Sequence, residues 1–360
     1  MNNRRRVWTT AFGGVLAATV AVVAQTANAA PAPAPAGSTM GQAFTKAASE
    51  FDVPRDLLVA VGYSETHLDG HDGKPSQDNG FGVMHLVSNP ERHTLERAAK
   101  LTGESKADLR KDDAANIRGA AAVLRADADK AGLKASDRAD LAAWYPTVAR
   151  YGGAESDQLA RLYADSAFEF VSKGVRGRTA GAEDVRSAPH KVSPDRGEFA
   201  KVSADPGTRS DDYPPAIWNP ADAANYATGR TAAISQVVVH VTQGSYAGTI
   251  SWFKNPDSQV SAHYVIRSSD GEVTQMVRDG DTAWHAKGGN ASAIGIEHEG
   301  FVDDPSWFTD AMYRSSAALT KYMCDKYGIP KDRAHVVGHS EVPGNDHTDP
   351  GPNWNWDTYM

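Results

Sequence analysis

The spacing of apolar residues changes once along this 360-residue chain, and that change constrains the fold more than any other feature. Between residues 40 and 173, apolar residues recur every three or four positions, as in PRDLLVAVGYSE and DAANIRGAAAVLRADADKAG. This is the repeat of an amphipathic helix. Between residues 216 and 360, short β-branched runs alternate with helical segments. The pattern predicts an all-α domain at 40–173, then an α/β domain with a central mixed sheet flanked by helices at 216–360.

The sequence of the second half also predicts individual strands and helices. Buried strands are expected in ISQVVVHVTQ, SAIGIEHEG and HVVGHSEV, which are short and rich in β-branched residues. SAHYVIRSSDGEVTQMV predicts a hairpin with its turn at Asp270-Gly271. AGTISWFKNP predicts a short helix, and TDAMYRSSAALTKYMCDKYG predicts a long helix that ends at Gly328. In the first half, Asp52 and Ser136 are expected to be helix N-caps.

The remaining segments read as leader and linkers. Arg4, Arg5 and Arg6 precede an apolar stretch that ends in Ala-Asn-Ala, which predicts a cleaved signal peptide over residues 1–29. A membrane anchor is the alternative, but Thr and Gly interrupt the apolar stretch and no charged stop follows it. Export could use the Sec or the twin-arginine route. Residues 30–39 form a Pro/Ala linker, and residues 174–215 a polar linker between the two domains.

The bulk composition excludes some functions. A net charge of -8 gives no reason to expect binding to nucleic acid or to an anionic membrane surface. The single cysteine, Cys324, excludes an intramolecular disulfide. After the leader, no stretch approaches the roughly 18 apolar residues that a membrane-spanning helix needs. The sequence therefore predicts an exported protein that folds without disulfides and has no membrane association after cleavage of the leader.

Metal-binding residue types are concentrated near the C-terminus, in GHSEVPGNDHTDPGP. His339 closes a predicted strand, Asp349 lies in the loop after it, and His240 lies in the middle of another strand. Two histidines, one carboxylate and a water form a common catalytic zinc arrangement. The alternatives are a solvated acidic loop and, for His240, a hydrogen-bonded core histidine.

Several blocks of the second half occur in the order of a known family. VSAHYVIRSSDGEVTQMVRDGDTAWHAKG, SAIGIEHEG and VVGHSEVPGNDHTDPGP together resemble the zinc-dependent N-acetylmuramoyl-L-alanine amidases, which include AmpD-like enzymes, peptidoglycan recognition proteins and T7 lysozyme. The resemblance spans roughly residues 232–356. It implies Zn²⁺ bound by His240, His339 and Asp349, with Glu297 as the catalytic acid and base.

The resemblance also implies the reaction. The enzyme would hydrolyse the amide between N-acetylmuramic acid and the L-alanine of the stem peptide in peptidoglycan. The family often has a lysine two residues before the last ligand, where this chain has His347. We expect His347 to stabilise the oxyanion only when it is protonated or donates an N–H. Trp284 and His285, in AWHA, match a segment that lines the substrate groove, although core packing explains them equally well.

The first half resembles the fold of lytic transglycosylases and goose-type lysozymes over roughly residues 40–151. Glu65 falls on the catalytic acid of that family, and Gly82, Met84 and Asn116 match its pattern. His85 departs from it, because the family has glutamine there. The domain could therefore be a degenerate module that only binds glycan or serves as a spacer.

These observations predict a secreted, cell-wall-associated bacterial amidase that acts on peptidoglycan with Zn²⁺ as its cofactor. A bifunctional enzyme that also cleaves glycan through Glu65 is one alternative, and a non-catalytic peptidoglycan-binding protein is another. The sequence leaves open the stem-peptide preference, the choice between the cell's own wall and a foreign one, and the oligomeric state.

Overall fold

The computed structural model describes residues 39–153, 156–179, 181–202 and 208–360. All of them belong to one unit, Ser38–Met360. The predicted signal peptide and nearly all of the predicted Pro/Ala linker lie outside the described residues. Within the described ranges, no helix combines the length and apolar character needed to cross a bilayer.

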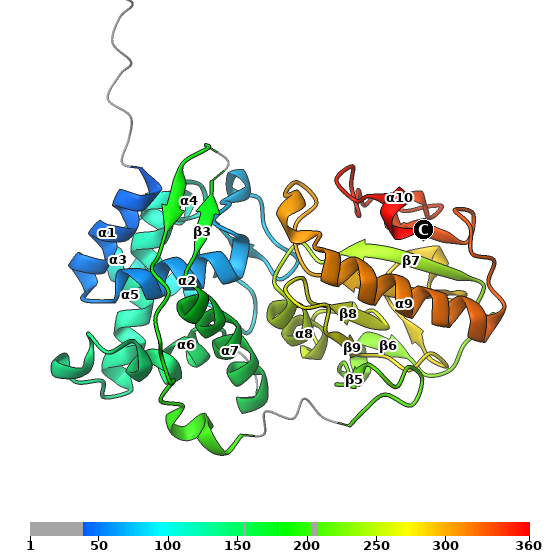
Figure 1. Cartoon of the computed structure of the whole chain (residues 1–360), viewed down its shortest axis with the longest axis horizontal. Coiled ribbons are helices and arrows are strands. Elements are labelled where there is room, and N and C mark those ends of the chain that lie inside the picture. Colours follow the sequence, from blue (N-terminus) through cyan, green and yellow to red (C-terminus); the bar gives the residue numbers. More distant parts are fainter. Residues whose placement is uncertain (1–38, 154–155, 180, 203–207) are drawn as a thin grey trace, which may run out of the picture. The chain divides into compact units, whose positions relative to one another are not determined.

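Helices make up most of the first half (Figure 1). Their apolar faces bury one core that includes Phe44, Leu57, Leu58, Ile117 and Trp144. The helices are α1 (Met40–Phe51), α2 (Arg55–Thr66), α3 (Thr94–Thr102), α4 (Lys106–Lys111), α5 (Asp113–Lys130), α6 (Tyr145–Tyr151) and α7 (Asp157–Lys173). The helical pattern in the sequence is thus confirmed over this half.

Two predicted helix caps are wrong. Asp52 is the C-cap of α1, because its backbone is left-handed and its N–H donates to the Ala48 carbonyl. The N-cap of α2 is Pro54 instead. Ser136 lies inside a short 3₁₀ turn, Ala135–Asp137, rather than before an α-helix. Polar residues that favour caps also favour turns, so residue type alone did not separate the two.

The first half is not purely helical. β1 (Gly80–Phe81) pairs antiparallel with β2 (Leu86–Val87). β3 (Arg176–Arg178) pairs with β4 (Asp184–Arg186), and a 3₁₀ turn follows at Gly197–Lys201. Val175, Val185 and Phe199 are buried in the helical core. Much of the described part of the predicted 174–215 linker therefore packs onto the first half.

The second half is built on a six-stranded mixed sheet in the order β12-β7-β11-β8-β9-β5. β7 is parallel to both β12 and β11, whereas β8 and β9 form the predicted antiparallel hairpin. The strands are β5 (Ile217–Trp218), β7 (Gln236–Val241), β8 (Tyr264–Ile266), β9 (Val273–Gln275), β11 (Ala293–His298) and β12 (Val336–Gly338). A separate pair joins β6 (Tyr226–Ala227) to β10 (Thr282–Ala283).

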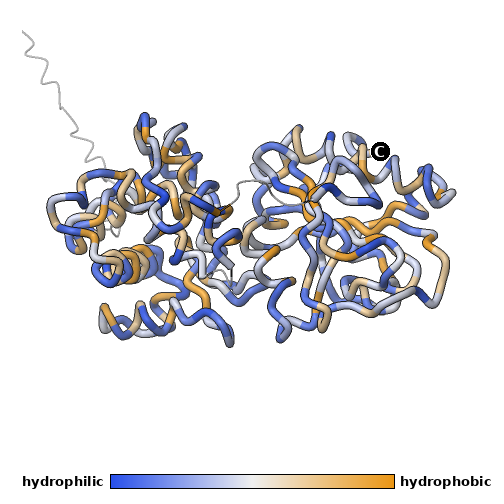
Figure 2. The backbone as a smooth tube through the Cα atoms, turned by 90° about the horizontal axis from the view of Figure 1, so that it is seen from below, coloured by the Kyte–Doolittle hydropathy of each residue, from blue (hydrophilic) through white to orange (hydrophobic). Residues whose placement is uncertain are grey.

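Apolar side chains cover both faces of this sheet. Val237 and Val239 on β7 join Ile294 and Ile296 on β11 in the cluster packed by α9 (Asp310–Tyr327), whereas Val238 faces the other way. Figure 2 shows hydrophobic segments running through the interior of this half. The predicted helices are confirmed as α8 (Tyr246–Lys254) and α9, which ends at left-handed Gly328, and a short α10 (Trp356–Tyr359) follows. The central α/β sheet is therefore as predicted.

Candidate active site

Two neighbouring strands place the first two site residues side by side. In the parallel register of β7 and β11, His240 lies opposite Glu297. Paired residues on adjacent strands project from the same face of the sheet. Ile296 packs into the α9 cluster, so Glu297 projects from the opposite face of the sheet.

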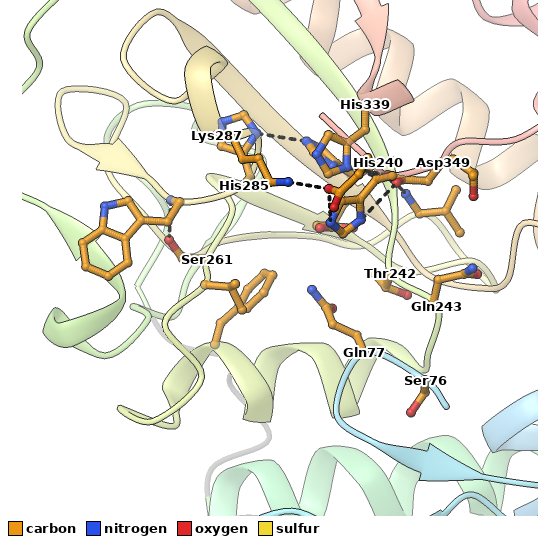
Figure 3. A pocket seen from close by; sticks show the side chains of 18 of the residues that line it. Ser76, Gln77, His240, Thr242, Gln243, Ser261, His285, Lys287, His339 and Asp349 are labelled. Carbon is orange, nitrogen blue, oxygen red and sulfur yellow. Dashed lines mark hydrogen bonds and ion pairs between the residues drawn. The ribbon is translucent and has the colours of Figure 1, made fainter. Parts of the chain in front are cut away.

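The loop after β12 brings the other two residues to the same point. His339 directly follows β12, and its Nδ1 lies 3.0 Å from Asp349 Oδ1. His240 Nδ1 lies 3.3 Å from Asp349 Oδ2 (Figure 3). One ligand atom from each of these residues falls within 4.8 Å of the others, and all three residues are buried. Over the described part of the chain, this is the one group of three or more His, Cys, Asp or Glu residues that could hold a metal ion.

Burial makes this cluster electrostatically unusual. Burial lowers the pKa of His240 to about 4, although Asp349 acts in the opposite direction. Burial would raise the pKa of Asp349, but hydrogen bonds and charge from His240 and His339 hold it well below its ordinary value. A neutral imidazole at His240 and an ionised carboxylate at Asp349 are the forms of these two side chains that bind a divalent cation. Nitrogen and oxygen donors in this number fit zinc.

Glu297 has a buried carboxyl in which one oxygen lacks a partner within the described part of the chain. Its carboxyl is 5% exposed, and Oε2 is buried without a hydrogen-bond partner among the described residues. Burial, followed by the charge of Asp349, raises the pKa of Glu297 well above its ordinary value. An orphaned carboxylate oxygen beside a candidate metal site is available to a water or a substrate.

His347 is the most exposed of the predicted site residues. Its side chain is 59% exposed, and its Nδ1 lies 3.8 Å from Asp349 Oδ1. The ring stacks on His339 with centroids 4.5 Å apart. His347 therefore stands at the rim of the cluster, where it lines the pocket described below.

His285 belongs to the cluster, whereas Trp284 stands further along its pocket. His285 Nδ1 lies 2.9 Å from His240 Nε2, and burial lowers the pKa of His285 well below its ordinary value. A Cβ on Gly295 would come within 2.6 Å of the His285 ring, so glycine gives this ring its space. Trp284 is half-buried and donates its backbone N–H to Ser261 Oγ. Both residues line the pocket described next.

A pocket of about 620 Å³ opens over these residues. Its walls include Lys287 and, from the first half of the chain, Pro75, Ser76 and Gln77 (Figure 3). None of these four residues was predicted from the sequence to belong to the site. Nothing in the local sequence indicates that a loop about 165 residues before His240 closes the same pocket.

Glu65 lies outside this pocket, in a closed polar network. It is 1% exposed, and its carboxylate accepts hydrogen bonds from Tyr163 Oη at 2.5 Å and from Ser245 Oγ at 3.3 Å. His85 Nδ1 lies 3.2 Å from the same carboxylate. The structure thus surrounds Glu65 with polar and charged groups, whereas a glycan-cleaving acid needs an apolar pocket open to substrate.

The site combines two buried imidazoles and a carboxylate that could hold a metal ion, and a buried glutamate lies on the strand beside them. Comparison with known proteins indicates the class of protein. Residues 230–352 match the family described as N-acetylmuramoyl-L-alanine amidase. N-acetylmuramoyl-L-alanine amidase A of Achromobacter lyticus is 44% identical over 165 residues, covering 41% of this chain and 93% of that protein.

Two further relatives carry the name AmpD. The 1,6-anhydro-N-acetylmuramyl-L-alanine amidase AmpD of Haemophilus influenzae is 40% identical over 111 residues, covering 28% of this chain and 58% of that protein. A solved structure of a selenomethionine AmpD derivative is 27% identical, covers 42% of this chain and 96% of its own, and has a TM-score of 0.35. From the sequence matches, this chain belongs to the N-acetylmuramoyl-L-alanine amidase family. It is a hydrolase that acts on peptidoglycan.

Proposed function

We propose that this amidase is zinc-dependent and that His240, His339 and Asp349 hold the ion. The observation that carries the proposal is the convergence of these three buried donors beside the unpartnered Oε2 of Glu297. When bound, zinc would supply Lewis acidity, which lowers the pKa of a bound water and polarises a carbonyl oxygen. The match of the family and the chemistry of the donor set both support zinc.

The chain's own side chains supply the remaining steps. Glu297 would accept the proton of the attacking water at Oε2 and return it to the amine of the leaving L-alanine. His347 would donate a ring N–H to the oxygen of the substrate carbonyl as negative charge develops there. His285, 2.9 Å from His240, would limit the positions open to the His240 ring. The bond cut would be the amide between the lactyl group of N-acetylmuramic acid and L-alanine.

For the first half we propose a lysozyme-like fold that has no glycan-cleaving activity through Glu65. Its helices bury one core, which fits that fold class. Glu65 pairs with His85, and burial in this network leaves it 1% exposed. A general acid must reach the glycosidic oxygen, and the burial of Glu65 behind these contacts opposes that requirement. The half would instead support the amidase.

We further propose that the protein is secreted and associates with the cell wall. The proposal rests on the leader pattern over residues 1–29 and on peptidoglycan as the substrate of the family. It is tested by the N-terminal sequence of protein recovered from the culture medium, which should begin after Ala29. A full-length N-terminus in the medium would contradict the predicted cleavage.

Mass spectrometry of peptidoglycan digested by the protein tests the reaction and the metal together. We expect free stem peptides and unsubstituted glycan, lost on chelation and restored by zinc. Reducing-end or anhydro muropeptides that survive chelation would instead assign the chemistry to the first half. Full activity after verified removal of metal would contradict the zinc proposal.

A further inference from the structure

The first half of the chain supplies one wall of the amidase pocket. The segment Pro75–Gln77 lines it together with His240, Glu297 and Asp349. This segment lies between α2 and β1 and is outside the residues that match the amidase family, which begin at residue 230. A segment outside the matched amidase residues therefore forms one wall of the pocket over the candidate metal site.

Hydrogen bonds hold the Pro75–Gln77 wall in place. Ser76 Oγ is buried, where it donates to Asp78 Oδ1, lies 2.7 Å from His85 Nε2 and accepts from the Gly80 N–H. The Gln77 N–H donates to the Gln243 carbonyl at 3.2 Å. Gln243 follows His240 by three residues, so the wall is attached at the end of the strand that carries a predicted metal ligand.

Aromatic contacts hold the same two surfaces together. The His67 ring stacks on Trp307 with centroids 3.5 Å apart, and His71 stacks on Phe301 at 3.7 Å. His67 Nδ1 also lies 2.8 Å from Ser306 Oγ. Stacked rings at these separations restrict sliding between the surfaces. The position of Gln77 relative to the pocket is therefore set by several independent contacts.

The Gln77 side chain is free to meet a ligand. The residue is exposed, and its side-chain amide makes no hydrogen bond to any part of the chain that the structure describes. Figure 3 shows it pointing into the pocket. A primary amide offers both donors and an acceptor, which suits the neutral amides and hydroxyls of N-acetylated sugars and of peptides.

We propose that Gln77 is a substrate-binding residue of the amidase, hydrogen-bonded to a neutral amide or hydroxyl group of peptidoglycan. The inference rests on the proposed use of this pocket as the amidase cleft. The group could belong to the glycan strand or to the stem peptide, because both present the same chemistry. A side chain that binds in this way without touching the reacting atoms affects substrate affinity rather than the chemical step.

The test is steady-state kinetics of the zinc-loaded full chain with Gln77→Ala, using two substrates with the same stem peptide. One carries a single N-acetylmuramic acid, and the other a glycan strand of several sugars. Loss of one neutral hydrogen bond should raise KM about three- to tenfold with kcat unchanged. If KM rises only for the substrate with several sugars, Gln77 contacts the flanking sugars. If KM rises for both substrates, Gln77 contacts the muramoyl unit or the stem peptide.

Lys74→Ala is the matched control, because Lys74 precedes the segment, is exposed and does not line the pocket. Gln77→Glu keeps the size of the side chain but removes its N–H donors, and it should raise KM as Gln77→Ala does. Unchanged KM on both substrates in both variants would overturn the proposal. So would a fall in kcat alone. Wild-type hydrolysis of the same substrates, measured in parallel, tests the proposed function separately.

Discussion

At the scale of single residues, Glu297 carries the proposed proton transfer. Its carboxyl is buried, and Oε2 has no partner among the described residues. Glu297→Gln keeps the shape of the side chain and removes its basicity. We expect kcat to fall by about 10²–10⁴-fold, the usual contribution of a positioned general base. Zinc content, measured on the same sample, should remain at the wild-type level; if kcat were retained, Glu297 would not be the base.

Substitutions of His347 test whether this histidine takes the place of the lysine that the family often has there. His347→Lys restores a fixed cation and should retain activity, whereas His347→Ala removes the donor. We expect His347→Ala to lower kcat about ten- to a hundredfold, somewhat less than loss of a well-buried oxyanion donor, because His347 is 59% exposed. His93→Ala, at an exposed histidine that does not line the pocket, is the control. Equal kcat in the alanine and lysine variants would exclude a role for His347 as donor.

The sequence predicted the residues of the site better than its walls. His240 and Glu297 lie on strands whose alternation places them on one face, whereas His339 and Asp349 were indicated by the family motif GHSEVPGNDHTDPGP, and the structure brings His240, His339 and Asp349 together. Gln77 could not be found in this way, because its role depends on contact between segments far apart in sequence.

At the scale of elements, β11 depends on a glycine for close packing. A methyl at Gly295 would come within 2.6 Å of the His285 ring, which contacts His240. Gly295→Ala should therefore displace His285, lower kcat/KM and reduce the free energy of unfolding by about 1–3 kcal/mol. Gly288→Ala is the control, since a Cβ there meets only ordinary contacts. Thermal melting and kinetics should separate the two variants, and identical behaviour would contradict the packing argument.

The turn between β1 and β2 holds a buried ion network that should make stability depend on pH. Burial opposes a charge on His85, but Asp78 and Glu65 outweigh it and raise the pKa of His85 to about 10. Arg92 also contacts Asp78. The network should stabilise the fold fully below the ordinary histidine pKa of 6.5, and this stabilisation should be lost as pH rises through about 10.

Unfolding by urea between pH 6 and 10 measures this effect. Between pH 6 and 10, the free energy of unfolding of the wild type should fall by on the order of a few kcal/mol more than that of His85→Gln. His93→Gln, at an exposed position, should follow the wild type. If the free energy of unfolding varied with pH in the same way for the wild type and His85→Gln, His85 would not be charged in the folded protein.

Elements were predictable where one sequence period dominates. The helices of the first half follow a repeat of 3.6 residues, and the strands around β7 are short runs rich in β-branched residues. The short pairs β1–β2 and β3–β4 have two or three residues per strand, which is too short for a period to show. The polar composition of residues 174–215 predicted a linker, although Val175, Val185 and Phe199 are buried in the helical core.

At the scale of the whole molecule, the two halves share contacts that separate domains on a linker would lack. Ser245, the N-cap of α8, donates to Glu65, and Ala247 is buried in the core of the helical half. His67 and His71 stack on Trp307 and Phe301. Such contacts should couple the stability of the halves, so that they unfold in one transition.

Calorimetry of the protein with and without zinc tests this coupling. Because zinc would bind only the folded site, its removal should lower the melting temperature of a single peak. Hydrogen exchange gives a second measurement. On removal of zinc, backbone amides in the helices of the first half should also exchange faster, although they lie far from the metal site. His67→Ala removes one stacking contact and should weaken the coupling, which would broaden or split the transition. Two separate peaks in the wild type, with zinc shifting only one, would show that the halves fold independently and that the wall formed by Pro75–Gln77 is not fixed.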